Sequence, residues 1–117
     1  MHQIGLFLAL MIALLHLWIL VMEMFRWEHP RTRKVFGTTP EVAALTKKMA
    51  ANQGLYNGFL AAGILWGYLR PDDGIILFFL GCIAVAGIYG GITVKPRIAM
   101  VQTLPAVIVM AMIWLGQ

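Results

Sequence analysis

Residues 1–22 read MHQIGLFLALMIALLHLWILVM and contain no Asp, Glu, Lys or Arg. Further along the chain, residues 49–69, 74–94 and 98–117 are also free of these charged residues and mostly apolar. A helix of roughly 20 apolar residues is long enough to cross the hydrocarbon core of a bilayer. We therefore predict an integral membrane protein with four membrane-spanning helices.

The composition indicates the same class of protein. Of the 117 residues, 61% are hydrophobic and 12% are charged, and the mean hydropathy is +0.82. A soluble domain carries about 25% charged residues, because its helices and strands need faces in water. The composition therefore excludes a soluble enzyme, a nucleic-acid-binding protein and a disordered chain.

The polar segments between the apolar runs predict where each helix ends. We expect residues 1–117 to form one all-α transmembrane domain, a four-helix bundle. Its helices are predicted over residues 4–25, 39–69, 73–92 and 96–116. The first of these is expected to be a retained helix rather than a cleaved signal peptide, because no Lys or Arg precedes the apolar run.

Two helix starts carry capping signals. Thr38 and Glu41 have the spacing of a capping box, which predicts Thr38 as the N-cap of the second helix. The short connection from Arg70 to Asp73 supplies an Asp that can cap the third helix. Near the C-terminus, Pro105 leaves the Val101 carbonyl without its helical hydrogen-bond donor.

The basic residues are concentrated on one side of the predicted bundle. Eight of the nine lie in or beside the first and third connections: Arg26, Arg31, Arg33, Lys34, Lys47, Lys48, Lys95 and Arg97. Basic loops of membrane proteins stay in the cytoplasm. We therefore predict a multi-pass protein of the bacterial cytoplasmic (inner) membrane, with both termini outside and a long basic cytoplasmic loop over residues 26–38.

Polar residues gather in the cytoplasmic halves of the predicted helices, where such groups are costly and usually face the interior of a bundle. Glu23 lies on the first helix, and His16 lies two turns before it on the same face. We predict a ligand pocket that opens toward the cytoplasm and takes its charge from Glu23. Its other candidate residues are Asn52, Gln53, Tyr56, Asn57, Tyr89, Arg97 and Gln102, with His16, Arg31 and Arg33 as additions. No metal site is predicted, because the spacing of His16 and Glu23 is longer than that of paired metal ligands on one helix.

Other interpretations of these residues stay open. Polar side chains between membrane helices often only hydrogen-bond across the helix interface. Glu23 could also pair with Arg26 or Arg97 at the membrane surface. The basic loop over residues 26–38 suits three roles: a determinant of topology, a contact with anionic lipid headgroups, or a lid that attracts an anionic ligand.

Glycines recur four residues apart in the second and third predicted helices, at 54 and 58, 63 and 67, and 87 and 91. Small residues at this spacing let two helices approach closely. The pattern predicts tight packing either within one chain or between the subunits of a dimer or trimer.

Several short motifs resemble one known family. They are EMFxW at residues 23–27, RxxKVF at 31–36, ANQGLYNGFLAAG at 51–63, GIYG at 87–90 and QxxPA at 102–106. Together they resemble the DUF1304 family of small bacterial membrane proteins of unknown function. The resemblance covers nearly the whole chain and implies a four-span fold without supplying an activity.

A looser similarity, in architecture only, is to the membrane-associated eicosanoid and glutathione metabolism (MAPEG) superfamily. Those proteins are four-helix trimers that bind glutathione between subunits, and Asn52, Asn57, Tyr89 and Arg97 fall where such a site would lie. The superfamily's Arg-and-Glu pattern on the second helix is absent. The sequence thus favours binding or transport of a small polar or amphipathic ligand. A glutathione-dependent membrane enzyme and a structural or accessory subunit are the alternatives.

Overall fold

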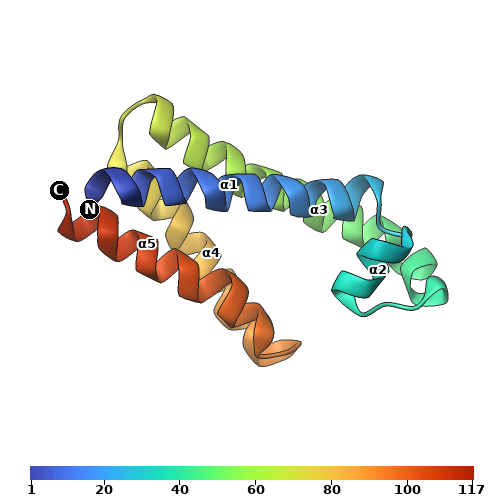
Figure 1. Cartoon of the computed structure of the whole chain (residues 1–117). Coiled ribbons are helices and arrows are strands. Elements are labelled where there is room, and N and C mark those ends of the chain that lie inside the picture. Colours follow the sequence, from blue (N-terminus) through green and yellow to red (C-terminus); the bar gives the residue numbers. More distant parts are fainter. The chain divides into compact units, whose positions relative to one another are not determined.

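The computed structural model describes residues 1–117, and its regular secondary structure is entirely helical (Figure 1). Its elements are α1 (His2–Phe25), α2 (Pro30–Phe36), α3 (Pro40–Leu69), α4 (Asp73–Thr93), a π-helical segment η1 (Ala99–Thr103) and α5 (Leu104–Leu115). The long helices lie close to the predicted ranges, because apolar runs bounded by Pro, Asp and Gly mark them clearly.

The caps of α3 and α4 differ in how well they were predicted. The Asp72 side chain accepts from the amides of Gly74 and Ile75, so the predicted Asp cap of α4 is confirmed. At α3 the predicted capping box is wrong, because Thr39 rather than Thr38 is the cap. The Thr39 hydroxyl accepts from the amide of Val42 at 3.2 Å. The cap side chain binds an amide three residues ahead, so a helix that starts at Pro40 needs its cap at position 39.

The predicted loop over residues 26–38 contains a helix that we did not predict, α2. His29 is its N-cap, with Nδ1 accepting from the amide of Arg31 at 3.1 Å, and Pro30 opens the helix. Gly37 ends it in the left-handed conformation, at φ 70°. Pro at the first position and Gly after the last one are known helix signals, so the sequence does contain this information.

The last predicted helix is interrupted by the π-helical segment η1. The amide of Leu104 donates to the carbonyl of Ala99, five residues back instead of four. Pro105 has no amide hydrogen, so a regular α-helix would leave a carbonyl unpaired at this place. A single π turn before the proline changes the register of the helix. In this register the Thr103 hydroxyl donates to the Ala84 carbonyl of α4 at 2.8 Å.

The chain forms two compact units, and each is described by itself. The first comprises residues 1–14 and 60–117. Within it α4 runs antiparallel to α5, and the end of α3 runs antiparallel to the start of α4. Its core holds the buried side chains of Ile64, Ile76, Leu80, Ile83 and Ile113. The second unit comprises residues 15–59 and contains the end of α1, all of α2 and the first part of α3.

The glycines of the first unit make helix contacts within the chain. A side chain at these positions would meet an opposing helix, as follows: Gly63 faces Phe79, Gly67 faces Ile76, Gly87 faces Thr103 and Gly91 faces Ala99. The predicted close packing is therefore confirmed for these pairs, and it joins helices of one chain.

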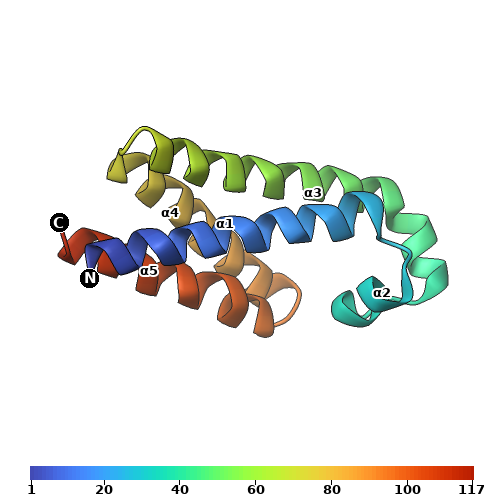
Figure 2. The same ribbon diagram turned by 45° about the horizontal axis from the view of Figure 1, so that its top comes forward.

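A polar cluster joins the two termini of the chain to the start of α4. Asp73 Oδ2 lies 2.6 Å from His2 Nε2 and accepts from Gln117 Nε2 at 3.0 Å. Figure 2 shows the first turn of α1 beside the end of α5, and this cluster ties both to α4.

Asp73→Ala should lower the free energy of unfolding by about 1 kcal/mol or less, because a partly exposed polar contact of this kind contributes little. The His2 and Asp73 side chains are 26% and 23% exposed. The measurement is the thermal midpoint in detergent. The control is Glu41→Ala, which removes an exposed carboxylate from α3. Equal midpoints for the two variants would mean that the cluster adds no stability.

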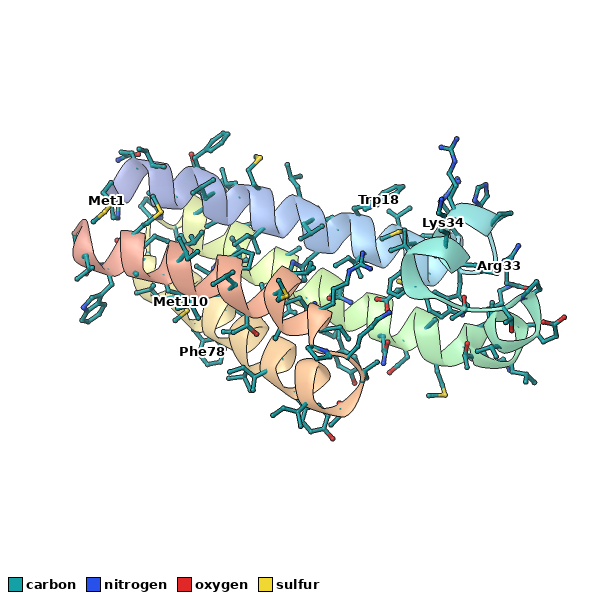
Figure 3. All side chains as sticks on the ribbon, turned by 60° about the horizontal axis from the view of Figure 1, so that its bottom comes forward. Met1, Trp18, Arg33, Lys34, Phe78 and Met110 are labelled. Atoms are coloured by element: carbon teal, nitrogen blue, oxygen red, sulfur yellow. The ribbon has the colours of Figure 1, made fainter.

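Large apolar side chains cover much of the surface. Phe78 is 65% exposed and points outward from α4 (Figure 3). Two helices, α1 and α4, are long and apolar enough to cross a membrane, whereas Ala99–Leu115 is apolar but shorter. The polar residues of α3, among them Asn52 and Gln53, reduce its apolar character.

Candidate functional site

In the second unit α1 and α3 run antiparallel in close contact. A Cβ atom at Gly54 would lie 2.7 Å from Met24 Cγ, 3.1 Å from Glu23 Cβ and 3.2 Å from the Leu20 carbonyl oxygen. A glycine, which has no side chain, lets the two helix backbones approach this closely. The close approach at Gly54 places the next turn of α3 within hydrogen-bonding distance of Glu23.

The centre of the candidate site is a hydrogen bond between these two helices. Asn57 Nδ2 donates to Glu23 Oε1 at 2.7 Å and also to the Gln53 carbonyl at 3.2 Å. Glu23 is buried, with 4% of its surface exposed. Its partner is an uncharged amide, so the pairing with Arg26 considered from the sequence is not what the structure has. The result is a buried carboxyl group that is paired with a neutral amide within the second unit.

The remaining candidates on α3 lie at the surface around Asn57. Asn52, Gln53 and Tyr56 are exposed, and Asn57 is half-buried. The rings of Tyr56 and Phe59 meet edge to face, with centroids 5.6 Å apart. The polar face of α3 is thus exposed at Asn52, Gln53 and Tyr56, and Asn57 links it to the buried Glu23.

The other predicted site residues are distributed as follows. His16 is buried on α1. Arg31 and Arg33 belong to α2, and Arg33 projects from it beside Lys34 (Figure 3). Tyr89 and Arg97 are exposed and Gln102 is half-buried, and all three belong to the first unit. Within the second unit, the hydrogen bond between Glu23 and Asn57 joins two residues of the predicted set.

A second feature of this unit was not predicted. A hollow of about 320 Å³, here called the corner hollow, opens where α1 ends and is lined by residues 24–29 and Lys47. Trp27 stands in its wall. Its Nε1 donates to Thr46 Oγ1 at 3.1 Å, and its ring packs against Phe36 of α2 with centroids 5.0 Å apart. The aromatic and basic character of this segment was visible in the sequence, but the hollow also needs Lys47 of α3, which is distant in sequence.

Two further contacts hold α2 and α3 near the corner hollow. Arg33 Nε donates to the Glu28 carbonyl at 3.2 Å. Lys47 Nζ lies 3.4 Å from Glu28 Oε1 in an ion pair whose side chains are 65% and 48% exposed. An ion pair this exposed contributes little to stability.

Comparison with known proteins gives one family and one relative. The model of a family described as "Protein of unknown function (DUF1304)" matches residues 10–114. The chain is 26% identical over 99 residues to "Uncharacterized protein YpaA" of Lactococcus lactis subsp. lactis (strain IL1403), across 81% of this chain and 83% of that protein. No solved structure matches the chain.

Proposed function

Since the chain belongs to the DUF1304 family, whose function is open, we propose from its own geometry that it binds or carries a small amphipathic cation in a bacterial cytoplasmic membrane. The observation that carries this proposal is the buried Glu23 carboxylate on an apolar helix, paired with the neutral amide of Asn57. A carboxylate in such a place is costly unless a positive charge compensates it.

The exposed apolar surface supports the membrane placement. In the most apolar stretch of α1, 28% of the residues are buried within the chain, and the same fraction is buried in α4. A helix in the core of a soluble protein would be mostly buried. In α1 and α4, lipid can cover the apolar residues that are exposed. We propose that α1, α3, α4 and the η1–α5 segment all cross the membrane, as one bundle of four spans.

The distribution of charge supports the orientation within that membrane. Arg70, Asp72 and Asp73 lie at the connection between α3 and α4. Six basic side chains lie between residues 26 and 48, at the connection between α1 and α3. By the positive-inside rule the α1–α3 connection is cytoplasmic and both termini are outside. Glu23, near the end of α1, is then close to the cytoplasmic surface.

The residues around Glu23 favour an amphipathic cation over an anion. Glu23 supplies the charge and the Asn57 amide orients its carboxylate. Tyr56 and Phe59, both exposed, present aromatic rings beside this pair along α3. Aromatic faces attract cations, and their apolar rings suit a hydrophobic ligand. The exposed side chains of Gln53 and Asn52 would be the polar edge of the same site.

The experiment is thermal unfolding of the detergent-solubilised protein with tetraphenylphosphonium, a hydrophobic cation. We expect the midpoint to rise in the wild type. The rise should vanish in Glu23→Gln, which keeps the size of the side chain but removes its charge, and it should shrink in Asn57→Ala. Glu41→Gln, at an exposed carboxylate in the first turn of α3, is the matched control and should keep the full shift.

Two results would contradict the proposal. If Glu23→Gln keeps the full shift with tetraphenylphosphonium, the carboxylate does not bind the cation. If glutathione raises the midpoint and the cation does not, the glutathione-dependent alternative is favoured instead.

A further inference from the structure

We propose that the corner hollow is a binding site for the anionic headgroup of a membrane phospholipid. This inference rests on the membrane placement proposed above and is independent of the ligand at Glu23. The hollow lies at the end of α1, where the apolar helix gives way to the basic segment. In a membrane this boundary coincides with the headgroup layer.

The walls of the corner hollow match the two parts of a phospholipid. Met24, Phe25 and Trp27 are its apolar lining residues, and Phe25 is 74% exposed. Arg26 and Lys47 bring two cations to the same hollow. An acyl chain can lie against the apolar lining residues while the phosphate contacts Arg26 and Lys47. A free anion would contact only these two basic side chains.

The surrounding charge favours an anionic headgroup over a zwitterionic one. Residues 26–48 hold six basic and two acidic side chains, so they carry a charge of +4, equal to the net charge of the whole chain. Basic residues near a membrane surface attract anionic lipids. The net charge of the chain thus lies in the segment that includes the hollow, where Arg26 and Lys47 are the basic lining residues.

The corner hollow is built before any ligand arrives. The hydrogen bond from Trp27 to Thr46 joins its wall to α3, and the ring contact with Phe36 joins it to α2. Thr46 is itself held by its hydroxyl, which donates to the Val42 carbonyl at 2.7 Å. A preformed site loses less conformational freedom on binding than a flexible loop would.

Glu28 acts as the internal competitor of the headgroup. It pairs with Lys47 at 3.4 Å, and both side chains are largely in water. A phosphate that reaches the hollow can take the place of the Glu28 carboxylate on Lys47. Removal of this carboxylate should therefore strengthen lipid binding, which a purely structural role of the pair does not predict.

The test measures the thermal shift of the detergent-solubilised protein with dihexanoyl phosphatidylglycerol, dihexanoyl phosphatidylcholine or inorganic phosphate. We expect a saturable shift with phosphatidylglycerol alone. Arg26→Gln with Lys47→Gln should weaken the apparent affinity about tenfold or more. Lys34→Gln with Lys48→Gln removes the same charge from exposed residues outside the lining and should weaken it much less.

Glu28→Gln keeps the inference testable if the double variant fails to fold, because it should bind phosphatidylglycerol more tightly than the wild type. Equal weakening by the two double variants, weaker binding in Glu28→Gln or equal shifts with inorganic phosphate would each overturn the inference. Glu23→Gln should leave the phosphatidylglycerol shift intact, so this result is separate from the test of the cation site.

Discussion

In a Cys82→Ala background, Arg70→Cys should react with a membrane-impermeant maleimide in whole cells, whereas Lys34→Cys should react only after lysis. Arg70 lies at the end of α3 and Lys34 lies on α2, and both side chains are exposed. The proposed orientation puts a bilayer between them, because eight basic residues near the α1–α3 and α4–α5 connections hold those on the cytoplasmic side. In whole cells we therefore expect labelling of Arg70→Cys and no labelling of Lys34→Cys.

The parent Cys82→Ala protein has no cysteine and should not react, so it sets the background of the measurement. The reverse pattern, with Lys34→Cys labelled in whole cells, would overturn the proposed orientation. Labelling of both positions in whole cells would place α2 and the α3–α4 connection on the same side of the membrane. This result would contradict the proposal that α3, which lies between them, crosses the membrane.

Gly54→Ala should lower the free energy of unfolding by about 1–3 kcal/mol, the usual cost of an extra methyl group in a tight contact. The added Cβ would lie 2.7 Å from Met24 Cγ and 3.2 Å from the Leu20 carbonyl oxygen. The Met24 side chain can move, but the backbone oxygen cannot without a shift of α1. The measurement is the thermal midpoint in detergent, with helix content followed by circular dichroism.

Gly81→Ala is the matched control, since it makes the same change inside a long helix. A Cβ at Gly81 would meet only Met110 Cε, at 3.8 Å, which is an ordinary contact. This variant should be neutral or more stable, because Ala is a better helix former than Gly. Similar losses in the two variants would mean that glycine is required for a reason other than the close approach of α1 and α3.

Gly54→Ala should also reduce the rise in thermal midpoint that tetraphenylphosphonium is expected to cause. The added Cβ would lie 3.1 Å from Glu23 Cβ, so Glu23 must shift and its hydrogen bond with Asn57 is disturbed. Gly81→Ala should keep the shift. The same pair of variants thereby relates the packing of the helices to the proposed site.

Helix positions followed from the sequence because their signals are local. The apolar runs, the Asp72 cap and the charged connections act within a few residues. The errors were also local. Thr38 and Thr39 are adjacent and both are capping residues, so the pattern alone did not decide between them. The signals of α2, Pro30 and Gly37, lay within a segment whose basic residues suggested a loop.

The candidate site was predicted in part, for a physical reason. Helical spacing grouped Gln53, Tyr56 and Asn57 on one face of α3, and burial cost singled out Glu23. Which amide meets the carboxylate depends on the register between two helices that are separated by the α2 segment. That register is set by Gly54 against Leu20 and Met24, which no local pattern reveals.

By itself, the sequence determined that this protein is helical and apolar, roughly where its long helices lie, and which family it belongs to. These properties depend on composition and on neighbours along the chain. The tertiary structure decided that Asn57 is the partner of Glu23, that Thr103 binds α4 after a π turn, and that Trp27 and Lys47 line one hollow. Each of these is a contact between residues distant in sequence, and helix packing alone brings such residues together.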